Sequence, residues 1–206
     1  MRFTSGETMA PADGVPWFFD AGSDSLEFAY SGDMRRDDLG ERLNSPADLG
    51  RWLAERIERI DPGDVSDRDL SDALNLRDAL SGLYLAAASG APLPADDIDT
   101  VNLYAATPDI PPALGGGQRQ AGAGRLRVGQ VLSTLARDAV EIFGHLDETR
   151  VRTCDDSTCR MVFHDESRTN NRRWCSMERC GNRAKVRAHR ERAAMRRLEE
   201  RGRQLW

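Results

Sequence analysis

The chain has 206 residues, of which 39% are hydrophobic and 31% are charged. This length accommodates one medium domain with a small appendix, or two small domains. Segments with helical periodicity argue against general disorder, and no apolar stretch approaches the length of a transmembrane helix. The N-terminal segment also lacks the apolar run of a secretory signal, so we expect a cytoplasmic protein with reduced thiols and no membrane partner.

The formal net charge of −5 hides a strong asymmetry between the two parts of the chain. Residues 150–206 contain 16 Lys or Arg and 8 Asp or Glu, a balance of +8. Residues 1–149 contain 13 basic and 26 acidic residues, a balance of −13. The sequence therefore describes an acidic body that carries a basic C-terminal module, which the overall pI of 5.3 conceals.

The N-terminal region begins with a polar segment, residues 1–16, which we expect to be disordered. Two short apolar runs follow, 17–19 and 26–30, separated by turn-forming residues. The second run alternates apolar and polar side chains, and the two runs together predict a β-hairpin at the edge of the fold.

The rest of the body has helical periodicity. Ser45-Pro46 and Ser66 are typical N-terminal signals, because Ser caps a helix and Pro fits its first turn. Helices are predicted over 45–60, 66–90, 94–105 and 128–146. Their apolar stripes favour a helical core over a ligand-binding site.

Glycine and proline interrupt this pattern between residues 107 and 127, which predicts a long flexible connection. The triple glycine at 115–117 is not a phosphate-binding loop, because no Gly-Lys-Ser/Thr follows it. Residues 17–148 are therefore predicted to form one helical domain.

All four cysteines lie in one window as two pairs, Cys154 with Cys159 and Cys175 with Cys180. Each pair has four residues between its members, which is within the range of zinc-ligand spacings. Disulfides are disfavoured in a reducing compartment, and the spacings differ from those of iron–sulfur ferredoxins. We expect one structural Zn²⁺ per chain, bound by these four thiolates. His164 lies between the pairs, and its expected role is packing or hydrogen bonding.

The residues around the cysteines predict a small β-hairpin followed by a helix. Residues 161–163 are a predicted strand, 167–171 a turn and 172–174 the returning strand. A long helix is predicted from Cys180 to about Arg201, with Asn182 or, alternatively, Ser176 at its start. This order is typical of a treble-clef finger. The predicted fold is thus mainly α with small β-hairpins.

Basic residues concentrate on this last helix and on the turn before it. One helix face holds several arginines, and a neighbouring apolar face is expected to pack on the body. A row of guanidinium groups suits phosphate recognition, although a solvated, salt-bridged helix is the simpler alternative. The candidate nucleic-acid contacts are Arg168, Arg172, Arg173, Arg183, Lys185, Arg187, Arg190 and Arg197.

Two stretches resemble a known family. Trp174-Cys175-Ser176-Met177 and Cys180-Gly181-Asn182-Arg183 resemble the CGNR zinc finger, and the likeness extends over about residues 150–192. Proteins of that family typically carry an N-terminal ABATE domain, associated with stress-induced transcription regulation. Its opening segment usually reads Leu-Asp-Phe-x-Asn-Thr, whereas this chain has Leu26-Glu27-Phe28-Ala29-Tyr30-Ser31. The resemblance implies that the four cysteines are the metal ligands and that the family regulates transcription by binding DNA.

We therefore expect a zinc-dependent DNA-binding transcription regulator in which residues 150–201 contact DNA. The acidic body is expected to orient this module, to form a homodimer, or to sense a small-molecule or protein signal. The alternative is a zinc scaffold that binds RNA or protein.

Catalysis is the third hypothesis. His164, Asn171 and His189 supply the residue types of a His-Asn-His nuclease. Four thiolates, however, leave no open metal position at which water is activated. We therefore expect that the protein is not an enzyme.

Overall fold

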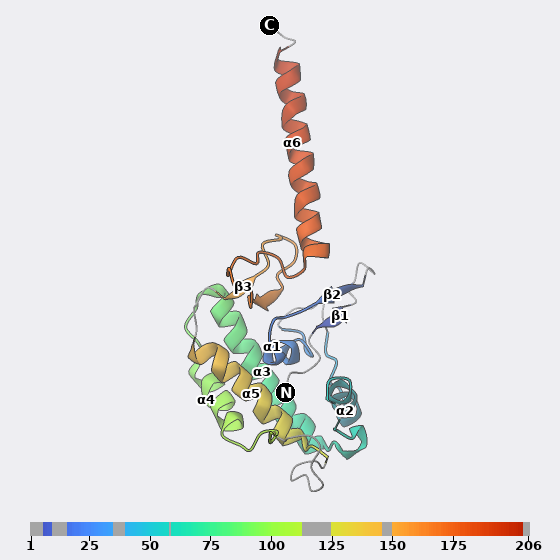
Figure 1. The fold of residues 1–206 in the computed structure, drawn as a ribbon, viewed down its shortest axis with the longest axis vertical. Coiled ribbons are helices and arrows are strands. Elements are labelled where there is room, and N and C mark those ends of the chain that lie inside the picture. The colour runs from blue at the N-terminus through green and yellow to red at the C-terminus, as the bar shows by residue number, and fades with distance from the viewer. Residues whose placement is uncertain are drawn as a thin grey trace.

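A computed structural model describes residues 6–9, 16–34, 40–57, 59–112, 125–145 and 150–203. It shows a helical body from which one long helix projects (Figure 1). The expected flexible connection lies largely outside the described residues, at 113–124. No helix in the described ranges is long and apolar enough to cross a membrane.

Five helices and one short 3₁₀ turn build the body. Their bounds are α1 Asp24–Ala29, α2 Pro46–Ala54, η1 Pro62–Asp64, α3 Asp67–Ser89, α4 Ala95–Ala105 and α5 Val128–Gly144. The central helix is α3, which packs against α1, α2, α4 and α5. It begins at a capping box in which Ser66 and Asp69 each bond the other's backbone N–H, and it ends at Gly90 in the left-handed conformation. The predicted helices over 66–90, 94–105 and 128–146 are confirmed, whereas the one over 45–60 ends earlier, at Ala54.

The first predicted hairpin is wrong in its second strand. Strand β2 (Trp17–Phe19) pairs antiparallel with β1 (Glu7–Met9), so part of the terminus expected to be disordered is a strand. Residues 24–29 form α1, whose N-cap Ser23 accepts a hydrogen bond from the Leu26 backbone. The alternation that suggested a strand has no structural counterpart, because consecutive residues of α1 are buried on all sides.

A second hairpin lies between the body and the projecting helix. Strand β3 (Val151–Thr153) pairs antiparallel with β4 (Val162–His164). The strand predicted at 161–163 is therefore confirmed to within one residue, but its partner precedes it in the chain. The returning strand predicted at 172–174 does not form. Arg173 contributes only an isolated backbone bond, in which its carbonyl accepts from the Asp155 N–H at 2.9 Å.

This hairpin and the body share one continuous hydrophobic core, which includes Val151, Val162 and Phe163 together with the body helices. The Tyr30 hydroxyl is 3.0 Å from the Val162 carbonyl, to which it donates, and 2.7 Å from the Val162 N–H, from which it accepts. Tyr30 is one of the residues at which the sequence departs from the family pattern. In this chain its side chain joins α1 to β4.

Gly22 lies close to the His164 backbone at the same junction. Its φ is +84°, and a Cβ at this position would lie 2.1 Å from the His164 carbonyl oxygen. The His164 N–H in turn donates to the Ala21 carbonyl at 2.8 Å. Only glycine combines this backbone conformation with so short a distance.

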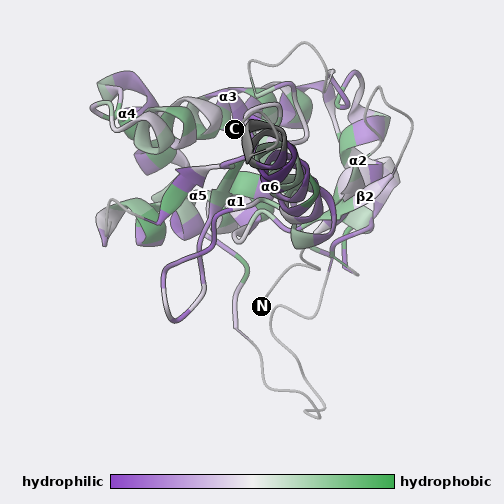
Figure 2. Cartoon of the chain, turned by 90° about the horizontal axis from the view of Figure 1, so that it is seen from above, coloured by the Kyte–Doolittle hydropathy of each residue, from purple (hydrophilic) through white to green (hydrophobic). Residues whose placement is uncertain are grey.

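The projecting helix is α6 (Asn182–Arg203), preceded by the π-helical turn η2 (Met177–Gly181). Ser176 caps η2 by accepting a hydrogen bond from the Arg179 N–H, so the alternative start at Ser176 is correct and Asn182 is not the N-cap. The expected packing of an apolar α6 face on the body is wrong. The helix points away from the body (Figure 1), and Val186 and Met195 are 50% and 58% exposed. From above, much of α6 is hydrophilic (Figure 2).

Replacing Tyr30 with Phe tests the junction between α1 and β4. Tyr30→Phe removes the hydroxyl and leaves the buried Val162 N–H and carbonyl without that partner. We expect the free energy of unfolding of the zinc-bound protein to fall by about 1–3 kcal/mol, as measured by urea denaturation. A change within experimental error would show that the hydroxyl does not stabilise the junction.

One carboxyl group in the core is unusual. Glu27 is 3% exposed, one of its carboxylate oxygens accepts from the Gly6 N–H, and the other has no hydrogen-bond partner in the described structure. Burial raises the pKa of Glu27 to about 7, although the Gly6 hydrogen bond and the charge of Arg56 oppose the rise. The carboxylates of Asp20 and Asp24 add to it.

This shift predicts a pH-dependent stability. The folded protein holds the Glu27 proton up to about pH 7, whereas the ordinary pKa is 4.5, so between these values the folded state binds more protons. The contribution of Glu27 to the free energy of unfolding is therefore greatest below pH 4.5. It is lost as the pH rises from 4.5 through 7, which lowers stability by about 3 kcal/mol. Glu27→Gln should remove this contribution and stabilise the protein at pH 8. Identical pH–stability curves for the two proteins would contradict the assignment.

Candidate metal centre and basic helix

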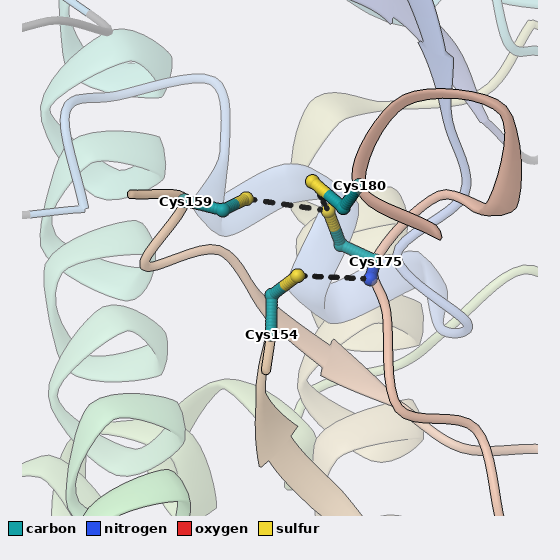
Figure 3. A group of neighbouring side chains, drawn as sticks. All are labelled: Cys154, Cys159, Cys175 and Cys180. Atoms are coloured by element: carbon teal, nitrogen blue, oxygen red, sulfur yellow. Dashed lines mark hydrogen bonds between the residues drawn. The ribbon is translucent and has the colours of Figure 1, made fainter. Parts of the chain in front are cut away.

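The four cysteine side chains converge on one point (Figure 3). All four sulfur atoms lie within 4.8 Å of one another, and all four residues are buried. The Sγ–Sγ distances are 3.4 Å for Cys159 and Cys175 and 3.6 Å for Cys175 and Cys180. These are too long for disulfide bonds, and the cysteines are free.

The spacing fits a tetrahedral zinc ion. With Zn–S bonds of about 2.3 Å, the edge of a regular S₄ tetrahedron is about 3.8 Å, close to the separations observed here. Four thiolates complete the coordination of Zn²⁺ and leave no open position, which is the arrangement of a structural site. The predicted ligand set, Cys154, Cys159, Cys175 and Cys180, therefore forms a structural zinc site.

Two different backbone structures present the ligands. Cys154 follows β3 and Cys159 precedes β4, so the first pair lies at the tip of the second hairpin. The Cys154 N–H donates to the Met161 carbonyl at 2.8 Å, which closes the base of this loop. Cys175 and Cys180 lie just before and within η2, so the second pair belongs to the start of the helical segment.

Gly181 follows the last ligand and is buried within η2. A Cβ there would lie 2.5 Å from the Met177 sulfur, so glycine makes room for the Met177 side chain. Its φ is not positive, so close packing accounts for the glycine rather than backbone conformation.

Arg183, the arginine of the Cys180-Gly181-Asn182-Arg183 motif, contacts a metal ligand directly. Its guanidinium donates to the Cys180 sulfur at 3.3 Å. The neighbouring thiols of Cys154, Cys159 and Cys175, together with this hydrogen bond, lower the pKa of Cys180. A lowered thiol pKa favours the thiolate, which is the form that binds zinc.

Asp156, in the loop between Cys154 and Cys159, joins this loop to the first turns of α6. Its side chain is fully buried, and its oxygens lie 3.5 Å from Arg183 Nε and 3.3 Å from Arg187. Burial alone would raise the pKa of Asp156, but hydrogen bonds from Thr158 and the two guanidinium groups hold it below its ordinary value. Arg187 also donates to the Ser157 hydroxyl at 3.0 Å.

Arg172, another predicted nucleic-acid contact, lies within the fold. Its guanidinium donates to the carbonyls of Asp20 and Cys175 and stacks 4.5 Å from the centre of the Phe163 ring. The Arg172 backbone N–H donates to the buried carboxylate of Asp165 at 2.8 Å. Arg172 therefore holds the finger against the body, and its guanidinium is already bonded to protein groups.

The other predicted contacts lie on the surface. Arg173 pairs with Asp155 at 2.7 Å. The remaining four are exposed and have no ion-pair partner among the described side chains: Arg168, Lys185, Arg190 and Arg197.

Sequence reasoning missed Arg192 and Arg196, which are equally exposed on α6. They were overlooked because they lie on the opposite side of the helix from the arginine face that was considered. Sequence reasoning also missed Asp156. An acidic residue two positions after a metal-binding cysteine was the available signal.

The three residues of the nuclease hypothesis lie in different parts of the finger: His164 on β4, Asn171 between β4 and η2, and His189 on α6. His164 lies on β4, with Nδ1 3.1 Å from the Gly22 carbonyl, which confirms the hydrogen-bonding role expected for it. Asn171 accepts a hydrogen bond from the Thr169 hydroxyl, and His189 is exposed on α6. In the described chain, the four cysteines are the one group of metal-ligating side chains placed to share an ion.

Zinc removal should unfold the finger selectively. We expect the purified protein to contain one zinc per chain, because four thiolates converge on one point. After chelation, hydrogen exchange should become fast over residues 150–181 while α3 remains protected by its own packing. Cys180→Ser should produce the same pattern without chelator. Unchanged exchange over 150–181 in the metal-free protein would show that the ion does not stabilise this fold.

Comparison with known proteins supports both halves of the structure. The model of the CGNR zinc finger matches residues 150–193, which cover the hairpin, the four cysteines and the first half of α6. The model of the ABATE family, described as "putative stress-induced transcription regulator", matches residues 22–145, which cover the helical body. None of the curated proteins compared with the chain matches it. The chain belongs to the ABATE family and carries a CGNR zinc finger.

Proposed function

We propose that this protein is a cytoplasmic, zinc-dependent transcription regulator that binds DNA through α6 and the adjoining zinc finger. The observation that carries the proposal is the position of α6. The helix projects from the body (Figure 1). Exposed basic side chains extend along it, and Lys185, Arg190 and Arg197 have no carboxylate partner among the described side chains. Polyanionic DNA is the partner that complements this surface.

The distribution of charge supports the same partner. The segment from residue 150 onwards has a balance of +8, whereas residues 1–149 have −13. DNA would be repelled by the body and attracted to the projecting helix, so the body restricts how the duplex approaches.

The zinc finger supplies the fixed base of this helix. The first ligand pair lies at the tip of a hairpin and the second at the start of the helical segment, an order that supports a treble-clef assignment. Asp156 holds Arg183 and Arg187, so these two arginines fix the direction of α6. The proposed phosphate contacts are therefore the exposed residues Arg168, Lys185, Arg190 and Arg197.

The body offers a place for a regulatory signal. A pocket of 210 Å³ lies between α3, α4 and α5 and is lined mainly by apolar side chains, including Leu83, Val101 and Phe143. We propose that an apolar ligand smaller than the usual occupants of protein pockets would bind here, because the lining is concave and apolar.

DNA binding should depend on salt and on exposed arginines of α6. We expect the zinc-bound protein to bind duplex DNA with a linear fall of log K against log salt concentration. Arg190→Gln should weaken binding and reduce the magnitude of this slope by about 1, since one phosphate contact is lost. Fluorescence anisotropy at several salt concentrations measures both quantities.

The control is Arg68→Gln, which removes an exposed arginine from α3 of the acidic body, one that lies 3.9 Å from Asp72. This variant should bind DNA as the parent does. Failure of the parent to bind genomic DNA fragments, or equal effects of the two substitutions, would contradict the proposed function.

A further inference from the structure

The basic residues of α6 form two stripes on opposite sides of the helix. With about 3.6 residues per turn, residues 183, 187, 190 and 197 fall within a sector of about 80°. Residues 185, 192 and 196 fall within about 40° on the opposite side. We call these sets the first basic stripe (Arg183, Arg187, Arg190, Arg197) and the second basic stripe (Lys185, Arg192, Arg196).

Both stripes are accessible. From Lys185 to Arg197 every basic side chain of α6 is exposed, because the helix does not pack on the body. A helix lying flat on an anionic surface needs positive charge on one side only. A helix with positive charge on two opposite sides is complementary to two anionic walls.

The second stripe has no evident structural role. Arg183 and Arg187 of the first stripe bind Asp156. No described carboxylate lies within ion-pair distance of Arg192 or Arg196, and Arg196 Nε donates only to the Arg192 carbonyl of the same helix at 3.4 Å. These two arginines are four residues apart, so their charges repel across one helical turn. Anionic groups beside them would remove this repulsion.

We propose that α6 lies within the major groove of B-form DNA. Arg190 and Arg197 of the first basic stripe contact the phosphates of one strand, and the second basic stripe contacts those of the other. The B-form major groove is about 12 Å wide and an α-helix with its side chains is about 10–12 Å across, so the groove admits one helix between two phosphate walls. The 22 residues of α6 span about 33 Å. This inference rests on the proposed function and specifies how the duplex is bound.

The same geometry selects DNA over double-stranded RNA. The major groove of A-form RNA is deep and narrow and excludes a helix. An RNA duplex would therefore meet only one stripe of α6 at a time. The two stripes should contribute equally to the binding of DNA and unequally to the binding of RNA.

Two matched double variants test the inference in the full-length, zinc-bound protein. Arg190→Gln with Arg197→Gln removes two charges from the first stripe, and Arg192→Gln with Arg196→Gln removes two from the second. All four residues are exposed arginines of the same helix, and Gln is a good helix former. Circular dichroism and zinc content confirm that each variant is folded.

Salt-dependent binding to a DNA duplex and to an RNA duplex of the same sequence is then measured. We expect each double variant to reduce the magnitude of the DNA salt slope by about 1.8, the value for two phosphate contacts. DNA should also be bound more tightly than RNA.

If the parent binds DNA but only one variant changes the slope, α6 lies on the outside of the duplex and the inference is wrong. If RNA binds equally well and responds equally to both variants, groove insertion is also wrong. A parent that binds neither duplex overturns this inference together with the proposed function.

Discussion

The convergence of four sulfur atoms is the constraint on which the finger depends. The first ligand pair lies on a hairpin loop and the second at the start of a helical segment, so the metal site joins two separate pieces of backbone. Without an ion, four buried thiols at these distances would have no strong attraction for one another. With zinc, the same arrangement is a closed tetrahedral site that contributes folding free energy.

A layer of ion pairs and hydrogen bonds transmits this constraint to the rest of the protein. Arg183 contacts both a ligand sulfur and Asp156, and Arg187 adds a second contact to the same carboxylate. On the other side, Tyr30 and Arg172 join the finger to α1 and to the segment before it. Two of the basic residues nearest the metal therefore fix the direction of α6, and the basic residues farther along it remain exposed.

The local patterns of the sequence were enough to predict most helices and the metal ligands. These patterns depend on residues that are close in the chain, so they can be recognised from the sequence alone. They include the helix cap at Ser66, the helical periodicity and the paired cysteines. The errors came from long-range contacts. Residues 26–30 alternate like a strand, but residues 24–29 form a helix, and the surrounding body buries its residues from Ser25 to Ala29. Arg172 looked like a phosphate contact, yet its guanidinium bonds the carbonyls of Asp20 and Cys175.

The apolar residues of α6 illustrate the same limit. Periodicity placed them on one face and predicted packing on the body, but a helical pattern does not specify whether a partner surface lies within reach. The structure shows the helix projecting instead (Figure 1). Because α6 projects, basic residues on two opposite sides of the helix are exposed. The sequence prediction considered only one of these sides.

The fixed position of α6 depends on one zinc ion bound by four cysteine sulfurs. X-ray absorption spectroscopy at the zinc edge of the purified protein tests this most directly. We predict a first coordination shell of four sulfur atoms at about 2.3 Å with no nitrogen or oxygen ligand. A shell containing nitrogen or oxygen, or fewer than four sulfurs, would contradict the closed four-cysteine site at the base of α6.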